Sequence, residues 1–296
     1  MAKKPKKPKK PNRLNVQGLS RREKGLLSCI VPDDGYTTVS IDLSAGEPTV
    51  TSHFSQDKNY MYACFDGVGK RPFYENGVLK IDDIYLMVMS VSPIGKSTMA
   101  EAWKRAWPAG SFADQWMEDC EVIKKYLKTA RQLHKILALG IGYSMGPKKM
   151  VKQMYEAGYA LSLKDARAFY KAYWELFSGV RTLSDNLTAQ VEEDKYLVNP
   201  FGFRVTPEPF KAFNAFIQST VSGIMHVFSV KLMAAAPYTQ WVTCIHDELI
   251  IDCPTNRLDE FKSDVARATA SLNEDLGWSV AIRTGFAPGK DWYEAK

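Results

Sequence analysis

Cysteine and histidine are scarce in this chain, and their spacing excludes the usual zinc sites. Five cysteines and four histidines occur among 296 residues. The cysteines form no CxxC pair, and the histidines show neither an HExxH nor a zinc-finger spacing. We therefore expect no bound zinc, and this cysteine usage favours a reducing, cytoplasmic location.

Long apolar runs are also lacking. The longest of them fall far short of the ~20 residues that a helix needs to cross a bilayer. The N-terminal sequence MAKKPKKPKKPNR is basic, but the apolar core of a signal peptide does not follow it. We expect no signal peptide and no membrane span. With 45% hydrophobic residues, the chain has enough apolar material for one large domain or two smaller ones.

The net charge of +6 is concentrated at the N-terminus. Seven of the 39 basic residues lie within residues 1–13, which contain no acid, so the remainder carries 32 basic and 33 acidic residues. Lysine pairs separated by prolines cannot pack or propagate a helix, so residues 1–13 are predicted to be a disordered basic tail. Contact with nucleic acid, a solubilising role and a nuclear-import signal all remain open for it.

Two segments have the pattern of strands. In residues 37–43, TTVSIDL, apolar and polar residues alternate, which places Asp42 on the polar face near the end of the strand. Residues 241–253, WVTCIHDELIIDC, predict a strand, a tight turn and a second strand, with the ionisable residues HDE at the turn. Each strand therefore ends beside a carboxylate.

Most of the other segments have helical periodicity. We expect helices at residues 84–90, 98–107, 117–139, 163–177, 180–194, 210–235 and 256–275, a turn or hairpin at 199–209 and a strand at 278–286. The glycines of LGIGYSMG are expected to end the helix at residue 139. Strands and helices together predict an α+β fold without an internal repeat.

The predicted helix at 117–139 carries two cations on one stripe. Arg131 and Lys135 are four residues apart, Leu139 continues the stripe, and Tyr143 follows beyond the glycine break. Two neighbouring cations repel each other unless an anion lies against them. An ordinary solvated face and a bound triphosphate are both open interpretations.

Asp42 and Asp247 each close an apolar, β-branched strand. A buried carboxylate costs several kcal/mol unless a cation or a hydrogen-bond network compensates it. Two carboxylates at adjoining strand ends favour Mg²⁺, which keeps water and takes further ligands from substrate phosphates. Each aspartate by itself can equally be a turn residue.

These residues resemble the three sequence motifs of the family A DNA polymerases, the DNA polymerase I family. The matching residues are Asp42, Ser44 and Glu47 for motif A (D-x-S-x-x-E), Arg131, Lys135, Gly140 and Tyr143 for motif B, and His246, Asp247 and Glu248 for motif C. Asn214 and Gln218 in the preceding helix and the Gly-x-x-Trp ending fit as well. The resemblance covers the chain from about residue 14 to its end.

The resemblance implies a fold. It predicts an antiparallel palm sheet with packed helices and a helical fingers subdomain, which together form a right-hand polymerase without a thumb. The palm would comprise residues 14–55 and 205–296, and the fingers residues 56–204.

It also implies a reaction and its site. Two Mg²⁺ ions would be held by Asp42, Asp247 and the backbone carbonyl of Leu43, and would serve transfer of a nucleotide from a dNTP to a primer 3′-hydroxyl. Lys135 would act as the general acid for the leaving group. The residues implied in dNTP binding are Arg131, Lys135, Leu139, Tyr143 and Glu47, of which Glu47 would block a ribose 2′-hydroxyl. Those implied in binding primer–template DNA are Asn214, Gln218, His246 and Glu248.

The chain departs from the family pattern at four positions. Thr49 replaces the usual Arg at the end of motif A, and Leu139 replaces Phe or Tyr in motif B. Tyr85 stands where His is frequent, and Phe210 stands where Arg is frequent. The metal ligands are retained, whereas some of the contacts to nucleotide and DNA are lost.

Motif A begins at residue 42, which leaves no room before it for a thumb or an exonuclease. We expect the palm and fingers subunit of a split polymerase, as in some phages, in which a second polypeptide supplies thumb and 3′–5′ exonuclease in the host cytoplasm. Two alternatives remain. One is a non-catalytic DNA-binding or scaffolding subunit derived from a polymerase, and the other is a relative of the single-subunit RNA polymerases, which lack the Glu of motif A.

Overall fold

The computed structural model describes residues 24–106 and 123–295, so the predicted basic tail lies outside the described residues. Contacts divide the chain into two compact units. The first, here called the sheet unit, comprises Met1–Ser44, Ser229–Ser271 and Thr284–Lys296. The second, the helical unit, comprises Ala45–Phe228 and Leu272–Arg283. The two units thus meet after residues 44 and 228, whereas the predicted palm and fingers meet after residues 55 and 204. The division into palm and fingers stays a prediction.

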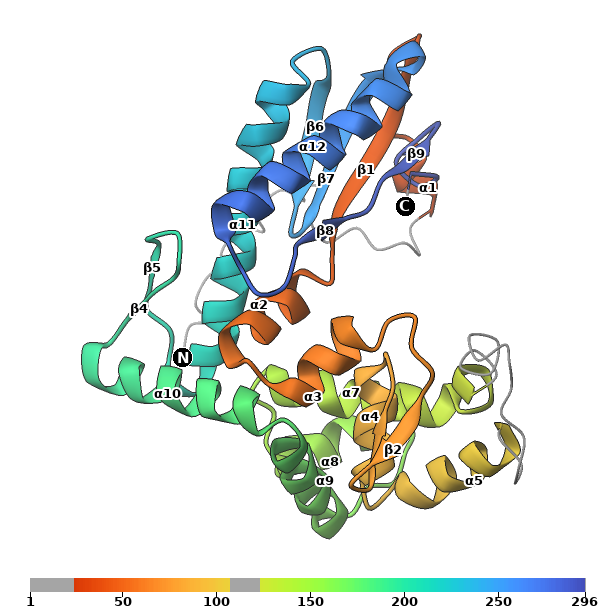
Figure 1. The fold of residues 1–296 in the computed structure, drawn as a ribbon, viewed down its shortest axis with the longest axis vertical. Coiled ribbons are helices and arrows are strands. Elements are labelled where there is room, and N and C mark those ends of the chain that lie inside the picture. Colours follow the sequence, from red (N-terminus) through yellow and green to blue (C-terminus); the bar gives the residue numbers. More distant parts are fainter. Residues whose placement is uncertain (1–23, 107–122, 296) are drawn as a thin grey trace, which may run out of the picture. The chain divides into compact units, whose positions relative to one another are not determined.

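The sheet unit is built on an antiparallel sheet (Figure 1). Its strands are β1 (Tyr36–Ser44), β6 (Gln240–Ile245), β7 (Glu248–Pro254), β8 (Arg283–Thr284) and β9 (Ala287–Gly289). The order is β6-β7-β1-β8, and β9 also pairs with β1. The strands predicted at 37–43 and 241–253 are confirmed. The prediction of a strand at 278–286 is wrong except at β8. The backbone N–H and C=O of Ile282 bond instead to the side chain of Asn273, which lies on the helix at Leu258–Leu276.

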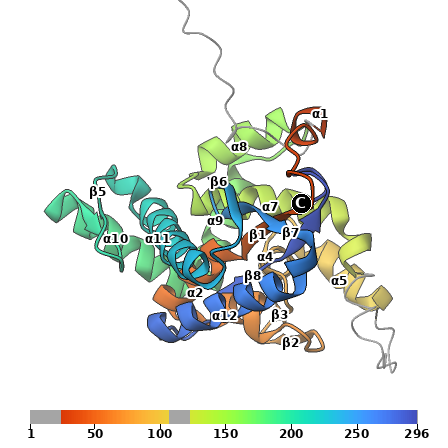
Figure 2. The ribbon, with the colours of Figure 1, turned by 90° about the horizontal axis from the view of Figure 1, so that it is seen from above.

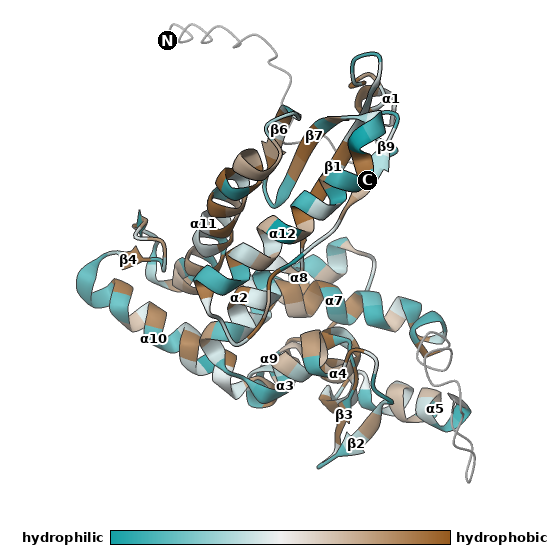
Figure 3. Ribbon diagram, turned by 45° about the horizontal axis from the view of Figure 1, so that its top comes forward, coloured by the Kyte–Doolittle hydropathy of each residue, from teal (hydrophilic) through white to brown (hydrophobic). Residues whose placement is uncertain are grey.

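Strands β1 and β7 form the centre of this sheet. Val39 and Ile41 of β1 and Ile250 and Ile251 of β7 are fully buried, which is the burial expected of paired β-branched residues. Helix α12 (Leu258–Leu276), which follows the short η4 (Thr255–Arg257), lies across one face of the sheet (Figures 1 and 2). Figure 3 shows β1 and β7 as predominantly hydrophobic.

The first and last described segments meet in the sheet unit. Leu27, in the short helix α1 (Lys24–Leu27), forms a core cluster with Ile245, Ile250 and Trp292. The backbone N–H of Trp292 donates to the carbonyl of Ile30 at 3.0 Å. The Gly-x-x-Trp ending therefore contributes its indole to the core.

The helical unit contains most of the helices. Its elements are α2 (Gly46–Ser55), α3 (Lys58–Met61), η2 (Tyr62–Asp66), β2 (Phe73–Glu75), β3 (Val78–Lys80), α4 (Ile84–Val91), α5 (Lys96–Ala106), α7 (Lys128–Gly142), α8 (Pro147–Glu156), α9 (Leu163–Leu176), α10 (Ser178–Asp194), β4 (Leu197–Val198), β5 (Arg204–Val205) and η3 (Pro209–Lys211). Helix α11 (Ala212–Ala235) begins in this unit and ends in the sheet unit. Four of the predicted helices are confirmed by α4, α5, α9 and α10, and two more by α11 and α12.

The helix predicted at 117–139 needs correction. Its first residues lie outside the described part, its described part is interrupted at Leu127, and α7 continues to Gly142. The glycine at 140 does not stop the helix; it makes room for a neighbour, because a Cβ there would lie 1.8 Å from Cε of Met145. Close packing, rather than a helix end, accounts for that glycine.

Within the described ranges, no helix is both long and apolar enough to cross a membrane. Four cysteines, Cys29, Cys64, Cys244 and Cys253, are free. Burial raises the pKa of the Cys64 thiol to about 12. That thiol therefore remains protonated at neutral pH.

Candidate functional site

The sheet unit brings the two predicted aspartates to adjoining strand ends. Asp42, near the end of β1, pairs with Glu248, the first residue of β7. One residue on, the backbone N–H of Leu43 donates to the carbonyl of Asp247 at 2.9 Å. Both aspartates are exposed. The register places both at the open end of the strands, where water can solvate the carboxylates, so the cost of burying a carboxylate does not apply to them.

A two-residue turn joins β6 to β7, as predicted. Ile245 pairs with Glu248, so His246 and Asp247 form the turn, and His246 has a φ of 55°. A left-handed conformation costs an L residue about 1–2 kcal/mol, which is why glycine is usual at such a position. With His246 in this conformation, the turn presents an imidazole and a carboxylate at the tip of the hairpin.

Glu248 is turned toward the sheet. Its Oε1 accepts a hydrogen bond of 2.6 Å from the hydroxyl of Ser40, which lies two residues before Asp42 on the same face of β1. Glu248, which was predicted to contact DNA, therefore already accepts a hydrogen bond within the sheet unit.

Sequence reasoning missed Gly285. Its backbone N–H donates to the carbonyl of Asp42 at 2.9 Å, and a Cβ at this glycine would lie 1.9 Å from Oδ1 of Asp42. Only a glycine leaves the Asp42 carboxylate in its place. The signal available in the sequence was a glycine inside a segment that otherwise had the pattern of a strand, WSVAIRTGF.

The donor set at this strand end fits Mg²⁺. Asp42 and Asp247 supply carboxylate oxygens at adjoining strand ends, and the Asp42 carboxylate lies where a side chain at residue 285 would be. Among the described residues, no group of three or more His, Cys, Asp or Glu side chains could hold a metal. A cation here would therefore complete its shell with water, backbone carbonyls and substrate phosphates, which is the mode typical of Mg²⁺ and not of zinc.

In the helical unit, the cationic stripe of α7 lies against the start of α4. The guanidinium of Arg131 forms an ion pair with Asp83, with 2.6 Å from Nη2 and 2.7 Å from Nε to Oδ2. Asp83 also caps α4 by accepting from the backbone N–H groups of Tyr85 and Leu86. The predicted phosphate ligand Arg131 is thus oriented by a carboxylate 48 residues earlier in the chain.

Tyr85 lies against both cations. The centroid of its ring is 5.1 Å from the Arg131 guanidinium and 5.8 Å from Nζ of Lys135. Burial raises the pKa of the Tyr85 hydroxyl above its ordinary value, so the ring remains neutral at physiological pH. Where the family often has His, this chain has an aromatic support for two cations.

A pocket of about 100 Å³ opens beside this cluster in the helical unit. Glu47, Tyr85, Leu139, Tyr143 and Asn214 are among its lining residues. Three of these residues, Glu47, Leu139 and Tyr143, were predicted to bind dNTP, and Asn214 was predicted to bind DNA. Two of the five, Tyr85 and Leu139, are departures from the family pattern. The Tyr143 hydroxyl donates to both oxygens of the Glu47 carboxylate, at 3.3 Å each. This contact joins residues 96 positions apart.

The remaining predicted DNA contact in this unit, Gln218, is exposed on α11, one turn beyond Asn214. One departure has a structural explanation. Thr49 is fully buried and its hydroxyl donates to the carbonyl of Ala45 at 2.8 Å, so a charged residue would not fit there. Phe210 is 60% exposed, and nothing in the structure explains its phenyl ring; its backbone carbonyl accepts a hydrogen bond from the hydroxyl of Ser144 just after α7.

Comparison with known proteins decides the family. The profile of DNA polymerase family A matches residues 111–294, which is more than half of the chain. The chain belongs to DNA polymerase family A. In this family A chain, motif B lies on α7 and at its end, and motif C is the turn between β6 and β7 with the first residue of β7. The resemblance inferred from the sequence is confirmed.

Curated relatives are distant and longer. The thermostable DNA polymerase I of Thermus filiformis is 23% identical over 281 residues, covering 90% of this chain and 28% of the relative. The DNA polymerase of Mycobacterium phage D29 is 24% identical over 267 residues, covering 88% of this chain and 35% of the relative. DNA polymerase I of Lactococcus lactis subsp. lactis is 23% identical over 183 residues, covering 56% of this chain and 20% of the relative. The chain therefore spans about a fifth to a third of the length of these relatives.

A solved structure has the same fold. The POL domain of Pol1 from M. smegmatis, in complex with DNA primer-template and dNTP, is similar with a TM-score of 0.67 at 18% identity. The match covers 95% of this chain and 45% of that one. The predicted fold class, an antiparallel sheet with packed helices and a helical part, is confirmed by this likeness and by the sheet register.

Proposed function

We propose that this family A chain carries out template-directed DNA synthesis, transferring a nucleotide from a dNTP to the 3′-hydroxyl of a primer. The observation that carries the proposal is the register that brings Asp42 and Asp247 to one strand end beside Gly285. Primer–template DNA and dNTP are the proposed substrates, by analogy with the ligands of the similar Pol1 structure.

The residues of this chain account for metal binding, triphosphate binding and protonation of the leaving group, and the proton of the primer 3′-hydroxyl is lost to water. Asp42, Asp247 and the Leu43 carbonyl would hold two Mg²⁺ ions, which when bound stabilise the attacking and leaving oxygens of an in-line displacement. The 3′-oxygen forms a bond to the α-phosphorus, and the bond to the bridging oxygen of the leaving pyrophosphate breaks. Lys135 gives its ammonium proton to that leaving group, and Arg131 binds the triphosphate.

The pocket at the end of α7 supports selection of the sugar. Glu47 is held by the hydroxyl of Tyr143 and lines the pocket, so its carboxylate has a defined position. A 2′-hydroxyl placed against it would meet a side chain that cannot withdraw without breaking that hydrogen bond. This supports DNA rather than RNA synthesis. Glu47 is the residue proposed to distinguish dNTPs from rNTPs.

A second polypeptide that carries a thumb and a 3′–5′ exonuclease stays a prediction. Copurification of a partner with the tagged chain, followed by stimulation of primer extension by that partner, tests it. High processivity of the isolated chain would contradict it.

Extension of a primed template by the purified chain with Mg²⁺ tests the proposed function. We expect incorporation of dNTPs to exceed that of rNTPs, and we expect Glu47→Ala to narrow the difference because the carboxylate no longer blocks the 2′-hydroxyl. Faster use of rNTPs by the wild-type chain would favour the RNA polymerase alternative. Absence of extension under any reconstitution would favour a scaffolding subunit.

A further inference from the structure

Two hydroxyl groups of β1 each hold a carboxylate of β7. The hydroxyl of Ser40 donates to Oε1 of Glu248 at 2.6 Å, and the hydroxyl of Thr38 donates to Oδ1 of Asp252 at 2.7 Å. Both lengths lie in the range of about 2.5–2.7 Å that is typical of a hydroxyl bonded to an ionised carboxylate, and such bonds are about twice as strong as neutral ones. The two bonds lie on one face of the sheet, because the two hydroxyl residues are two positions apart on β1.

The two bonds differ in their distance from the strand end that carries the proposed metal site. Asp42 is the next residue after Ser40 on this face of β1, and it pairs directly with Glu248. Directly opposite residues of an antiparallel pair have Cβ atoms about 4.5–5.5 Å apart. Thr38 pairs with Asp252 four residues before Asp42, which is about 13 Å along the strand. The Ser40 bond can therefore affect the site, whereas the Thr38 bond is remote from it.

The bond to Ser40 directs the Glu248 carboxylate back along β1, toward a residue two positions before Asp42. Among residues 24–106 and 123–295, no group of three or more His, Cys, Asp or Glu side chains could hold a metal, so in this orientation Glu248 adds no third ligand to the two aspartates. Ser40 itself is 5% exposed and lies between Val39 and Ile41, which are fully buried. The packed centre of β1 therefore fixes the hydroxyl that holds Glu248.

The number of carboxylates around a divalent cation decides what else the cation can bind. Where Mg²⁺ acts on phosphates, one or two carboxylates bind it, and water and substrate phosphates complete its octahedral shell. A third carboxylate raises the affinity for the cation, because ligand charge sets that affinity, and it takes a position that a phosphate would otherwise occupy. Glu248, directly opposite Asp42, is the side chain that could supply this third carboxylate.

We propose that Ser40 is a positioning residue that holds Glu248 outside the metal shell of Asp42 and Asp247. A cation bound by the two aspartates then keeps positions for the phosphates of its substrate. The same hydrogen bond offsets part of the repulsion among three carboxylates at one strand end. This inference rests on the proposed function, since it takes the cation to be bound by the two aspartates.

Titration of the full chain with Mn²⁺, without DNA or dNTP, measures this role independently of catalysis. Mn²⁺ accepts the same oxygen ligands as Mg²⁺, and the electron paramagnetic resonance signal of the free ion reports how much is bound. We expect Ser40→Ala to bind Mn²⁺ about tenfold more tightly, because the released Glu248 becomes a third carboxylate ligand. Ser40→Thr keeps a hydroxyl and should bind as the wild type does. Ser40→Cys retains a weak donor and should give a smaller gain, which tests the inference if the alanine variant does not fold.

A double-mutant cycle assigns the gain to Glu248. Glu248→Gln weakens Mn²⁺ binding in either background, because a negative charge near the cation is lost. The loss should be about tenfold larger in the Ser40→Ala background, where the carboxylate is a ligand, than in the wild type. Thr38→Ala is the matched control, because it releases Asp252 from an equivalent hydrogen bond on the same face of β1. That variant should bind Mn²⁺ as the wild type does.

Tighter binding by Ser40→Ala that Glu248→Gln reverses, with no change in Thr38→Ala, supports the positioning role. Unchanged or weaker binding by Ser40→Ala overturns it, and so does an equal gain in Thr38→Ala, which would show a general effect on the strand. In both cases the proposed function stands as long as Asp42→Asn and Asp247→Asn still weaken Mn²⁺ binding. Binding that these two variants leave unchanged would show that the ion lies elsewhere, and would contradict the proposed metal site together with the role of Ser40.

Discussion

The sheet unit and the helical unit position their functional groups by different means. In the sheet unit, Asp42 and Asp247 are exposed, and their positions follow from backbone pairing between β1 and β7. In the helical unit, Arg131 depends on the Asp83 carboxylate and Tyr143 bonds to Glu47, both far away in the sequence. Backbone pairing sets where the main chain of both aspartates lies, whereas the second arrangement depends on each partner side chain.

Gly285→Ala tests how the sheet unit positions the Asp42 carboxylate. The added Cβ would lie 1.9 Å from Oδ1 of Asp42, so the carboxylate must move. A misplacement of about 1 Å can cost about a hundredfold in rate, and we expect a loss of that size in single-turnover primer extension. The thermal unfolding midpoint should change little, since Asp42 is exposed and can turn into solvent.

Gly25→Ala is the control for this prediction in the same unit. A Cβ at Gly25 meets no atom of the described residues within 4 Å, and no left-handed φ is needed there. Full activity of both glycine variants would show that the position of the Asp42 carboxylate is not decisive.

A smaller effect is expected from the aromatic support in the helical unit. Tyr85→Ala removes the ring beneath Arg131 and Lys135, and a partly desolvated cation–π contact contributes about 0.5–2 kcal/mol. We expect KM for dNTP to rise about tenfold with a smaller change in kcat. Tyr85→Phe keeps the ring and should behave as the wild type. An equal loss in the two variants would assign the effect to the hydroxyl.

The smallest effect concerns stability rather than rate. His134 is buried in α7, its Nδ1 lies 2.8 Å from the carbonyl of Ala130, and its Nε2 has no hydrogen-bond partner among residues 24–106 and 123–295. Burial lowers the pKa of His134. The stability that the neutral ring contributes is therefore fully present above the ordinary value near 6.5 and is lost as pH falls toward the lowered pKa.

Urea unfolding between pH 7 and pH 5 measures this loss. The free energy of unfolding should fall over this range, and His134→Leu should reduce the fall. Part of it should remain, because burial lowers the pKa of His53 as well. An identical pH dependence in wild type and variant would exclude His134 as the source.

Prediction from the sequence succeeded where local pattern determines structure. Alternation of apolar residues predicts β1, and the same reasoning predicts the β6–β7 hairpin that carries Asp247. It failed where a long-range contact decides. Gly140 is inside α7 because of Met145, and the catalytic importance assigned to Gly285 depends on a contact with a strand more than 200 residues earlier.

The same limit applies to the site. Residue types and motif spacing identify the aspartates and the cations, because those groups carry the chemistry themselves. The support of the cations by Tyr85 and the ion pair of Arg131 with Asp83 arise from the packing of α4 against α7, and neither element signals this in its own periodicity. Exposure of the aspartates likewise follows from where the strands end.

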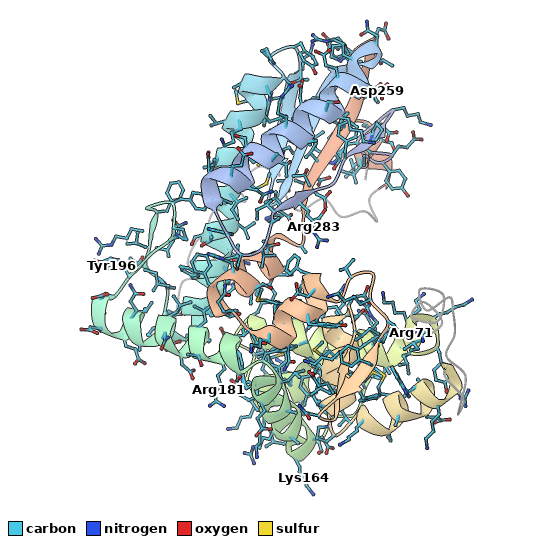
Figure 4. The ribbon with its side chains drawn as sticks, in the orientation of Figure 1. Arg71, Lys164, Arg181, Tyr196, Asp259 and Arg283 are labelled. Carbon is cyan, nitrogen blue, oxygen red and sulfur yellow. The ribbon has the colours of Figure 1, made fainter. Side chains whose placement is uncertain are left out.

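Primer extension by Asp42→Asn and Asp247→Asn tests the proposed site most directly. Asparagine keeps the shape of each side chain and removes the charge that would hold Mg²⁺. With Asp259→Asn, an acid on α12 that Figure 4 labels, as the matched control, we expect each of the two site variants to lose about a thousandfold or more in single-turnover rate while the control keeps full activity. Wild-type rates from both site variants would contradict catalysis at this strand end.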